Sequence, residues 1–474
     1  MNRNEEYAAL RQAMEGTPPR LEYAVRKALA RKSAFHKKRL IFGVPAGSLA
    51  VCCVTFILLV NLFPPFARAC GSVPVLRELA KAVAWSPSLS AAVEDEYVQP
   101  MDQEQTENGV TARVEYVIVD RKQVNIFYTL TGDTDRLLEA DATISGAHGV
   151  PLEGYSISSA SYGTPNGELR QVDVNFVDRD MPDSLDVTLQ IYQSGWDTTD
   201  SEAPATESVE DAYFTQSSHE PDYLAQLTFT LAFDPYFTAQ GKIVPVEQTF
   251  QLDGQTLTLN QAEIYPTHLR LDFGYAADNT AWLSGLEFYV ENERGERFSP
   301  ITNGITASGE EASPSMVTYW MDTTYFSDSK SLTLSITQAR WLEKDRDKIW
   351  LNLETGAHDP LPDGAEVADI RHSERGYLLT FREKMYREGL HYSLWQTYTD
   401  AAGTEKAFLS SGSSSTWQNP ETGVYEDGSE TGISFETVPL TDYHQSEVWL
   451  TPVFTHVIDF TDPVTLDILP QSNN

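Results

Sequence analysis

The sequence predicts a mainly β protein in which a single N-terminal transmembrane helix is followed by tandem Ig-like β-sandwich modules. Residues 40–66 contain no charged side chain, and about 20 apolar residues are enough to cross the hydrocarbon core of a bilayer. From about residue 105 the apolar residues follow the two-residue period of β-strands. The segment that opens this β region also recurs further along the chain.

Residues 1–39 form the expected cytoplasmic segment. They hold ten Lys/Arg and four Asp/Glu, a net charge of +6, and Lys37, Lys38 and Arg39 stand directly before the apolar run. Because basic residues mark the cytoplasmic side of a span, these three predict that the N-terminus lies inside the cell. The whole chain carries −35, so residues 40–474 carry −41. This acidic exterior part argues against nucleic acid as a partner.

Within this basic segment, Leu21, Val25, Ala28 and Leu29 recur at helical spacing. Two interpretations remain open. The helix either lies on anionic lipid through its basic face, or it docks through the apolar residues on a cytoplasmic partner. The segment is too short for an independent catalytic core.

A cleaved signal peptide is the alternative to a span at 40–66. Ala67-Arg68-Ala69 resembles a cleavage site, and Cys70 follows it. Signal peptides have shorter apolar regions and shorter leading segments than this chain, so we expect an uncleaved anchor. Cys70 is the one cysteine beyond the expected span, which leaves no intramolecular disulfide to stabilise the exterior part.

The exterior part divides by pattern into four regions. Residues 67–104 are expected to form a juxtamembrane helix, with Leu76, Leu79, Ala80 and Val83 on its apolar side, and a linker. Three β modules then follow at 105–238, 239–355 and 356–474. The predicted strands lie at 112–119, 123–130, 172–176, 185–192, 224–233, 256–264, 269–275, 286–290, 331–338, 348–353, 377–381, 392–398, 433–437 and 448–454.

An internal repeat supports the modular organisation. Residues 109–130 align with 254–275 without a gap, and the apolar positions coincide, as expected when both copies bury the same face. A fainter third copy starts near Gly364. Residues 197–223 and 410–419 are polar and are expected to be loops.

The sequence predicts no catalytic, cofactor-binding or metal-binding residue. It contains no HExxH, GxSxG or P-loop motif, and no GxGxxG after a strand. The histidines of the exterior part are scattered and form no pair with the spacing of zinc ligands. We therefore expect a protein that is not an enzyme and holds no cofactor.

The N-terminal half resembles a known bacterial family. The resemblance lies in a short basic segment and a single span, followed by 61–67 (NLFPPFA), 73–80 (VPVLRELA) and 109–128 (GVTARVEYVIVDRKQVNIFY). These features are similar to those of the domain-of-unknown-function 4179 family. The resemblance implies a β domain behind a juxtamembrane helix. Members are commonly encoded beside extracytoplasmic-function sigma factors, which implies a membrane-bound, anti-sigma-factor-like role.

The sequence thus predicts a single-pass plasma-membrane protein with a cytoplasmic N-terminus and extracytoplasmic β modules, acting as an envelope signalling regulator. Its expected partners are membrane lipid, a cytoplasmic sigma factor and an unknown extracellular ligand. The alternative is a cell-surface adhesion or ligand-binding protein with a passive anchor. An ectoenzyme is a third hypothesis and would require a cleft with converging polar groups.

Overall fold

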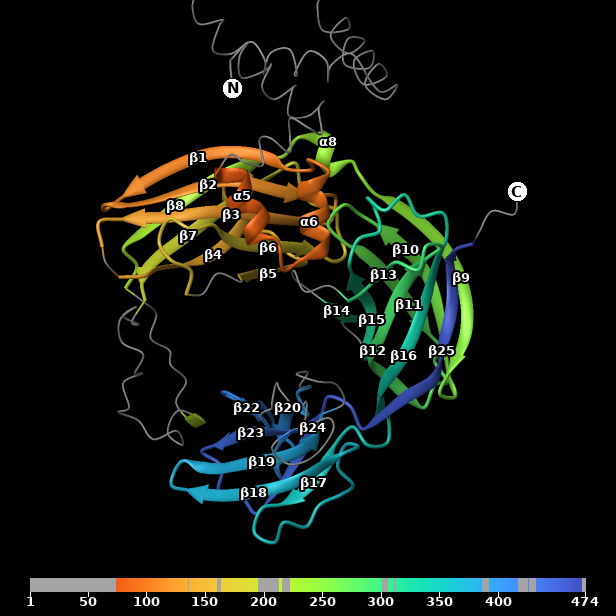
Figure 1. Cartoon of the computed structure of the whole chain (residues 1–474). Coiled ribbons are helices and arrows are strands. Elements are labelled where there is room, and N and C mark those ends of the chain that lie inside the picture. Colours follow the sequence, from red (N-terminus) through yellow and green to blue (C-terminus); the bar gives the residue numbers. More distant parts are fainter. Residues whose placement is uncertain are drawn as a thin grey trace, which may run out of the picture. The chain divides into compact units, whose positions relative to one another are not determined.

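The computed structural model describes residues 74–134, 136–159, 163–194, 213–214, 222–300, 306–310, 313–385, 392–416, 425 and 432–470 (Figure 1). The chain divides into two compact units, Met1–Ala82 and Val83–Asn474. Several predictions fall outside the described residues: the docking residues Leu21, Val25, Ala28 and Leu29, the topology residues Lys37, Lys38 and Arg39, and the span at 40–66. Among the residues that are described, no helix has the length and apolar character needed to cross a membrane.

Two short helices precede the β region. Helix α5 (Pro74–Ala82) covers the expected juxtamembrane helix. Helix α6 (Pro87–Glu94) is a second helix, in the part of 67–104 that is predicted from the sequence to be a linker. Ser86 caps α6 by accepting a hydrogen bond from the Leu89 amide, and Pro87 occupies the first turn, where its missing N–H costs nothing.

The first sandwich, here called sandwich 1, consists of two antiparallel sheets that share one core. Its larger sheet has the order β1-β2-β3-β6-β5, with β1 (Gln99–Glu107), β2 (Val110–Val119), β3 (Gln123–Gly132), β6 (Arg170–Phe176) and β5 (Tyr155–Ser159). The smaller sheet has the order β4-β7-β8, with β4 (Leu138–Gly146), β7 (Ser184–Gln193) and β8 (Ala225–Ala232). A short 3₁₀ helix, η1 (Ala147–Gly149), follows β4.

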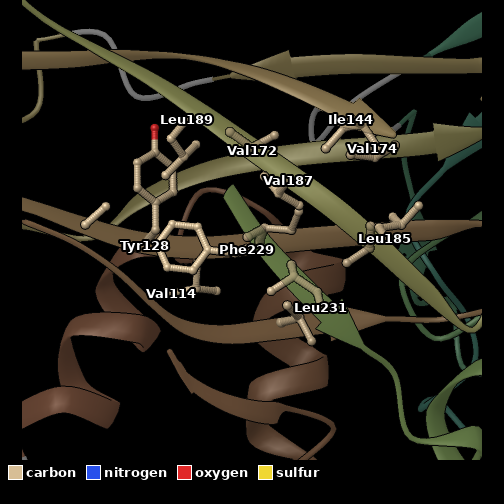
Figure 2. Packing of buried hydrophobic residues seen from close by; sticks show 14 of the residues in the cluster. Val114, Tyr128, Ile144, Val172, Val174, Leu185, Val187, Leu189, Phe229 and Leu231 are labelled. Atoms are coloured by element: carbon tan, nitrogen blue, oxygen red, sulfur yellow. The ribbon is translucent and has the colours of Figure 1, made fainter. Parts of the chain in front are cut away.

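The core of sandwich 1 lies between these two sheets (Figure 2). Val114, Tyr128 and Val172 come from the larger sheet and meet Leu189 and Phe229 from the smaller one, and all five are buried. Because successive residues of a strand point to opposite faces, strands such as β3, β7 and β8 supply every second residue to this core. Removal of these side chains from water is the main stabilisation available to a sandwich without disulfides.

Sandwich 2 follows helix α8 (Pro235–Thr238). One sheet has the order β14-β15-β11-β10-β9, with β14 (Ala307–Glu310), β15 (Ser313–Met321), β11 (Leu269–Tyr275), β10 (Gln255–Ile264) and β9 (Lys242–Leu252). The other has the order β13-β12-β16-β25, with β13 (Arg297–Phe298), β12 (Ala281–Asn292), β16 (Leu332–Glu343) and β25 (His456–Leu469). The two sheets enclose the second core.

Sandwich 3 is built from residues that lie between β16 and β25 in the chain. Its sheets have the orders β17-β24-β20-β21 and β18-β19-β23-β22 and share the third core. The strands are β17 (Ile349–Asn352), β24 (Glu447–Pro452), β20 (Trp395–Thr399), β21 (Glu405–Ala407), β18 (Ala365–Ser373), β19 (Gly376–Lys384), β23 (Ile433–Thr441) and β22 (Gly412–Ser415). Strand β22 lies in the segment 410–419, which the sequence analysis expected to be a loop.

The C-terminal strand returns to sandwich 2. The sequence predicts a third module at residues 356–474, but β25 pairs antiparallel with β16, and Trp341 lies opposite His456. Thr455 closes this pairing, since its amide donates to the Trp341 carbonyl oxygen (2.8 Å) and its hydroxyl oxygen accepts from the Glu343 amide (2.9 Å). Sandwich 3 is therefore an insertion at the tip of the β16–β25 hairpin.

The segments of the sequence repeat share an irregularity of backbone pairing. In β2, Val114 lies opposite Tyr128 and Tyr116 opposite Phe127, so one extra residue, Glu115, forms a bulge. The aligned residue of β10, Asn260, forms the same bulge against β11. Ala368 of β18 does so against β19. The mainly β fold class is confirmed, and each predicted strand overlaps an observed one.

Candidate functional site at the joint of sandwiches 1 and 2

Two turns that occupy equivalent places in the repeat meet between sandwich 1 and sandwich 2. Asp120 begins the β2–β3 turn, and Thr267 lies in the β10–β11 turn. The Asp120 Oδ2 atom accepts hydrogen bonds from the Thr267 amide (2.9 Å) and hydroxyl (2.6 Å). Its Oδ1 atom accepts from the amides of Lys122 (2.9 Å) and Gln123 (3.0 Å). A fully buried carboxylate thus receives four donors, which offset the cost of its burial.

His268 extends this group into sandwich 2. Its Nδ1 atom lies 2.8 Å from the Thr267 Oγ1 atom. Because the Thr267 hydroxyl donates its proton to Asp120, it accepts one from Nδ1–H, and this assigns the neutral Nδ1–H tautomer. The side chain is completely buried, and its Nε2 atom has no hydrogen-bond partner among the described residues. Burial lowers the pKa of His268, although Asp120 acts in the opposite direction.

Arg270 adds a second contact across the same joint. Its Nη1 atom donates to the Val177 carbonyl oxygen of sandwich 1 (2.7 Å), and its Nε atom donates to Asp272 (2.9 Å). The guanidinium carbon lies 5.6 Å from the centre of the Trp320 ring. Asp120, Thr267, His268 and Arg270 are called the joint residues below.

Helix α6 is also bonded to sandwich 2. The Ser88 hydroxyl donates to Asp322 (3.1 Å) and accepts from the Thr323 amide (3.0 Å), and both bonds are buried. Burial raises the pKa of the Asp322 carboxyl group. The Thr323 hydroxyl in turn donates to the Tyr265 carbonyl oxygen in the β10–β11 turn. Helix α6 is therefore connected to the β10–β11 turn, which holds Thr267 and His268.

An aromatic cluster adjoins this contact. The Tyr97 hydroxyl, just after α6, donates to the Phe237 carbonyl oxygen (2.6 Å). The Tyr97 ring lies 4.9 Å from that of Phe237, 6.4 Å from that of Tyr236 and 5.9 Å from that of Phe326, measured between ring centres. The Tyr325 ring lies 6.5 Å away. Such aromatic pairs favour a fixed mutual orientation of the elements that carry them.

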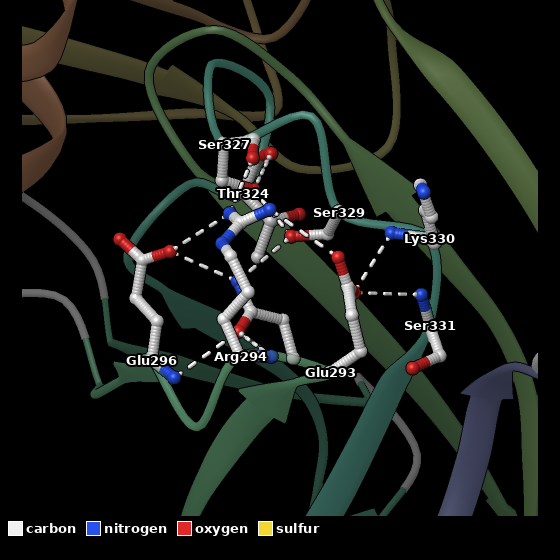
Figure 3. A network of polar contacts seen from close by, with 9 residues as sticks. Glu293, Arg294, Glu296, Thr324, Ser327, Ser329, Lys330 and Ser331 are labelled. Carbon is white, nitrogen blue, oxygen red and sulfur yellow. Dashed lines mark hydrogen bonds and ion pairs between the residues drawn. The ribbon is translucent and has the colours of Figure 1, made fainter.

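The segment that carries Tyr325 and Phe326 is itself held in place by polar contacts (Figure 3). The Glu293 carboxylate accepts from the amides of Lys330 (2.9 Å) and Ser331 (3.1 Å), which lowers the pKa of Glu293. Arg294 donates to the Ser327 carbonyl oxygen (2.5 Å) and to Glu296 (3.1 Å). Tyr325 and Phe326, which contact Tyr97, thus belong to a well-bonded part of sandwich 2.

Sandwiches 2 and 3 are joined by different contacts. The Tyr392 hydroxyl donates to Glu287, and the Arg340 guanidinium carbon lies 3.6 Å from the centre of the Tyr392 ring. The Ser284 hydroxyl donates to the Val453 carbonyl oxygen (2.6 Å). His456, in β25, lies between Asp363 (2.7 Å) and Asp253 (3.3 Å) through its two ring nitrogens. Because these carboxylates face opposite ring nitrogens, they do not converge on one point.

The sequence predicts no role for the joint residues. In it, His268 is only one of the scattered histidines, and Asp120 and Thr267 are single polar residues in turns. Their one available signal was the repeat, which aligns the two turns but does not show that they touch. Among the described residues, no group of three or more His, Cys, Asp or Glu side chains could hold a metal ion.

Comparisons with known proteins place two family domains on the chain. Residues 241–362 match a family of unknown function (DUF5643), which covers sandwich 2 except β25 and also includes β17 of sandwich 3. No curated protein matches the chain significantly. One similar solved structure is that of a conserved domain protein from Bacillus anthracis, with 14% identity and a TM-score of 0.37 over 56% of this chain and 85% of that chain.

Residues 37–132 match a domain of unknown function (DUF4179), from just before the expected span to the end of β3. This range contains the motifs on which the resemblance to that family rested, and it includes Asp120 of the joint. This part of the chain therefore belongs to the domain-of-unknown-function 4179 family, as its sequence predicted.

Proposed function

We propose that this protein is a single-pass membrane regulator whose extracytoplasmic sandwiches sense an envelope condition and whose residues 1–39 bind a cytoplasmic sigma factor. In this proposal it is not an enzyme. The span at 40–66 lies in the plasma membrane, the basic segment contacts lipid or the sigma factor, and the sandwiches meet an extracellular ligand.

The observation that best supports this proposal is the bonding of α6. A passive anchor needs only a flexible tether between membrane and ectodomain. Here the helix that follows α5 donates from Ser88 to Asp322 and accepts from Thr323, both in sandwich 2. Residues 83–86 connect the two helices, and the Ser86 amide donates to the Val83 carbonyl oxygen (2.9 Å). A change at the joint would thus act on α6, which begins 21 residues after the end of the expected span in the chain.

In this proposal, residues 1–39 act on transcription by binding the sigma factor. A helix with Leu21, Val25, Ala28 and Leu29 along one side would bury these residues against a sigma factor and cover the surface that the factor needs to bind RNA polymerase. Burial of one such side chain contributes about 1.5–3 kcal/mol. The side chains of Leu21 and Val25 would therefore account for a large part of the affinity of a short helix. Charged replacements at both positions should weaken binding strongly.

The test compares two faces of this helix in the full-length protein. Leu21→Asp with Val25→Asp should reduce capture of the proposed partner, an extracytoplasmic-function sigma factor from the same cell, by at least about tenfold and raise transcription from its promoters, because two buried side chains become charged. Arg26→Gln with Lys27→Gln is the matched control on the polar face and should leave capture unchanged. Capture is measured by crosslinking in cells and transcription with a promoter reporter.

Two outcomes would contradict the proposal. If the apolar-face variant captures the sigma factor as well as the unmodified protein, the helix does not dock through these residues. If the apolar-face variant has no effect and the polar-face variant releases residues 1–39 from the membrane surface, the helix lies on lipid. The latter result would favour an adhesion or ligand-binding protein with a passive anchor.

A further inference from the structure

We propose that the joint between sandwiches 1 and 2 is an acid-sensitive contact. Its two turns separate when His268 takes up a proton. The inference gives the proposed sensor a stimulus, but it concerns the ectodomain alone and does not require a sigma factor. It rests on the position of His268, which is completely buried and lies next to Thr267, the residue of sandwich 2 that donates hydrogen bonds to the Asp120 carboxylate of sandwich 1.

The hydrogen bonds of the closed joint use the neutral form of the ring. The Nδ1–H group donates to Thr267, and the Thr267 hydroxyl donates to Asp120. A proton added to the ring would go to Nε2, which is buried and faces no acceptor among the described residues. The Tyr265 ring lies nearby, with 5.1 Å between ring centres. The closed joint therefore cannot satisfy the new N–H donor.

The surrounding charges do not compensate for this. From sandwich 1, the β2–β3 turn contributes Asp120 and Lys122, and from sandwich 2, β10 and β11 contribute Glu263 and Arg270. Asp120 and Glu263 raise the pKa of His268, whereas Arg270 and Lys122 lower it. Asp120, the closest acid at 3.9 Å from Nδ1, already accepts four hydrogen bonds. Burial therefore decides the balance, and the pKa of His268 is lowered in the closed joint.

The sign of the pH effect follows from this direction. In an open joint His268 meets water and regains an ordinary imidazole pKa of about 6.5. Above that pH neither form is protonated and the closed joint is fully stable. As the pH falls below about 6.5, the open form binds a proton that the closed form excludes. Opening then becomes about tenfold more favourable per pH unit, until the lowered pKa of the closed form is reached.

The link across the joint makes opening local. The Thr267 amide and hydroxyl bond to Asp120 between the sandwiches, whereas the Lys122 amide bonds to Asp120 within its own turn. Separation of the turns would therefore expose the Thr267 amide while each sandwich keeps its own core. Ser88 of α6 is connected to the same turn through Thr323, so opening would also loosen the contact of α6.

The test measures hydrogen exchange of the peptide that covers residues 265–268 in the purified full-length protein, between pH 7.5 and pH 5.0. Rates are corrected for the intrinsic pH dependence of amide exchange. We expect protection to fall about tenfold per pH unit below about pH 6.5, while peptides from β19 and β23 in sandwich 3 stay protected. Constant protection of residues 265–268 across this range would overturn the proposal.

Substitutions assign the effect to the ring. His268→Asn keeps a donor near the position of Nδ1 but does not titrate, so its protection should no longer depend on pH. His444→Asn, at an exposed histidine of sandwich 3, is the matched control and should behave like the unmodified protein. If His268→Asn retains the full pH dependence, another group is responsible and the proposal fails. If this variant does not fold, His268→Gln replaces it, judged by the same criterion.

Discussion

At the scale of single residues, the contact between sandwiches 1 and 2 depends on one carboxylate, that of Asp120, where two turns meet. Asp120 is fully buried and receives two donors from its own turn and two from Thr267. A buried carboxylate is stable only when its oxygens are paired. Asp120 therefore fixes both the shape of its own turn and the position of its partner.

This arrangement predicts the effect of one substitution. Thr267→Val keeps the shape of the side chain but removes the hydroxyl that bonds to both Asp120 and His268. We expect the joint to lose about 2–3 kcal/mol, because a bond to a charged group disappears and the His268 Nδ1–H loses its acceptor. The thermal midpoint of the full-length protein at pH 7.5 measures this loss.

Thr258→Val provides the matched control for that experiment. The Thr258 hydroxyl pairs with that of Thr249 at the surface of the same sheet (2.9 Å), where water can replace the bond. Its midpoint should change little. If the two variants have equal midpoints, the Asp120–Thr267 contact does not stabilise the joint.

Contacts of this kind are beyond the reach of sequence reasoning. Asp120 and Thr267 lie 147 residues apart, and an aspartate that begins a turn is common in any β protein. His268 looked like one of several isolated histidines, since its burial depends on how two sandwiches meet. The predicted docking residues on 1–39 rest on helical spacing alone and remain predictions.

At the scale of elements, the predicted strands have alternating apolar residues, although β4 (LEADATISG) has them as well and is not among the predicted strands. In β3, Val124, Ile126 and Tyr128 all point into the core, and this period of two is visible in the sequence. Strand β1, with the sequence QPMDQEQTE, has no such pattern and was missed.

The glutamines of β1 show why a polar strand is stable at this place. The side-chain amides of Gln99, Gln103 and Gln105 donate to the carbonyl oxygens of Ala232, Thr230 and Thr228 in β8. They satisfy the free edge of the smaller sheet, which would otherwise be open to pairing with another chain. A hydrophobic pattern cannot reveal a strand whose role is to hydrogen-bond a neighbouring edge.

The β16–β25 hairpin yields a prediction for a whole element. Trp341 and His456 are paired at its tip, so residues 342 and 455 come next in register. Replacement of residues 343–454 with Asn-Gly, which favours a two-residue hairpin turn, should remove sandwich 3 and leave sandwich 2 folded. Hydrogen exchange of the β16 peptides should stay within about tenfold of that in the unmodified protein.

A variant that also lacks residues 456–470 is the control, because it leaves one edge of β16 without its partner strand. Its β16 peptides should lose protection and its sandwich 2 should unfold at lower temperature. If the Asn-Gly variant behaves like this control, sandwich 2 needs sandwich 3 in order to fold. Sandwich 3 would then not be an insertion that sandwich 2 can lose without loss of stability.

At the scale of the whole molecule, charge and chain order agree with a division into two compartments. Residues 1–39 carry a net charge of +6. The run at 40–66 is uncharged, so the −41 of residues 40–474 lies entirely beyond it. The acidic sandwiches would stay soluble and would be repelled by anionic lipid. The signalling proposal requires that the joint and the docking helix lie on opposite sides of the bilayer.

The most direct test of this account labels single cysteines in intact cells with a membrane-impermeant maleimide. In a background with Cys52, Cys53 and Cys70 replaced by Ser, Ala402→Cys lies in an exposed turn of sandwich 3, and Ser33→Cys lies in the basic segment. The account predicts that Ala402→Cys reacts in intact cells and that Ser33→Cys reacts only after permeabilisation. Reaction of Ser33→Cys in intact cells, or protection of Ala402→Cys there, would contradict it.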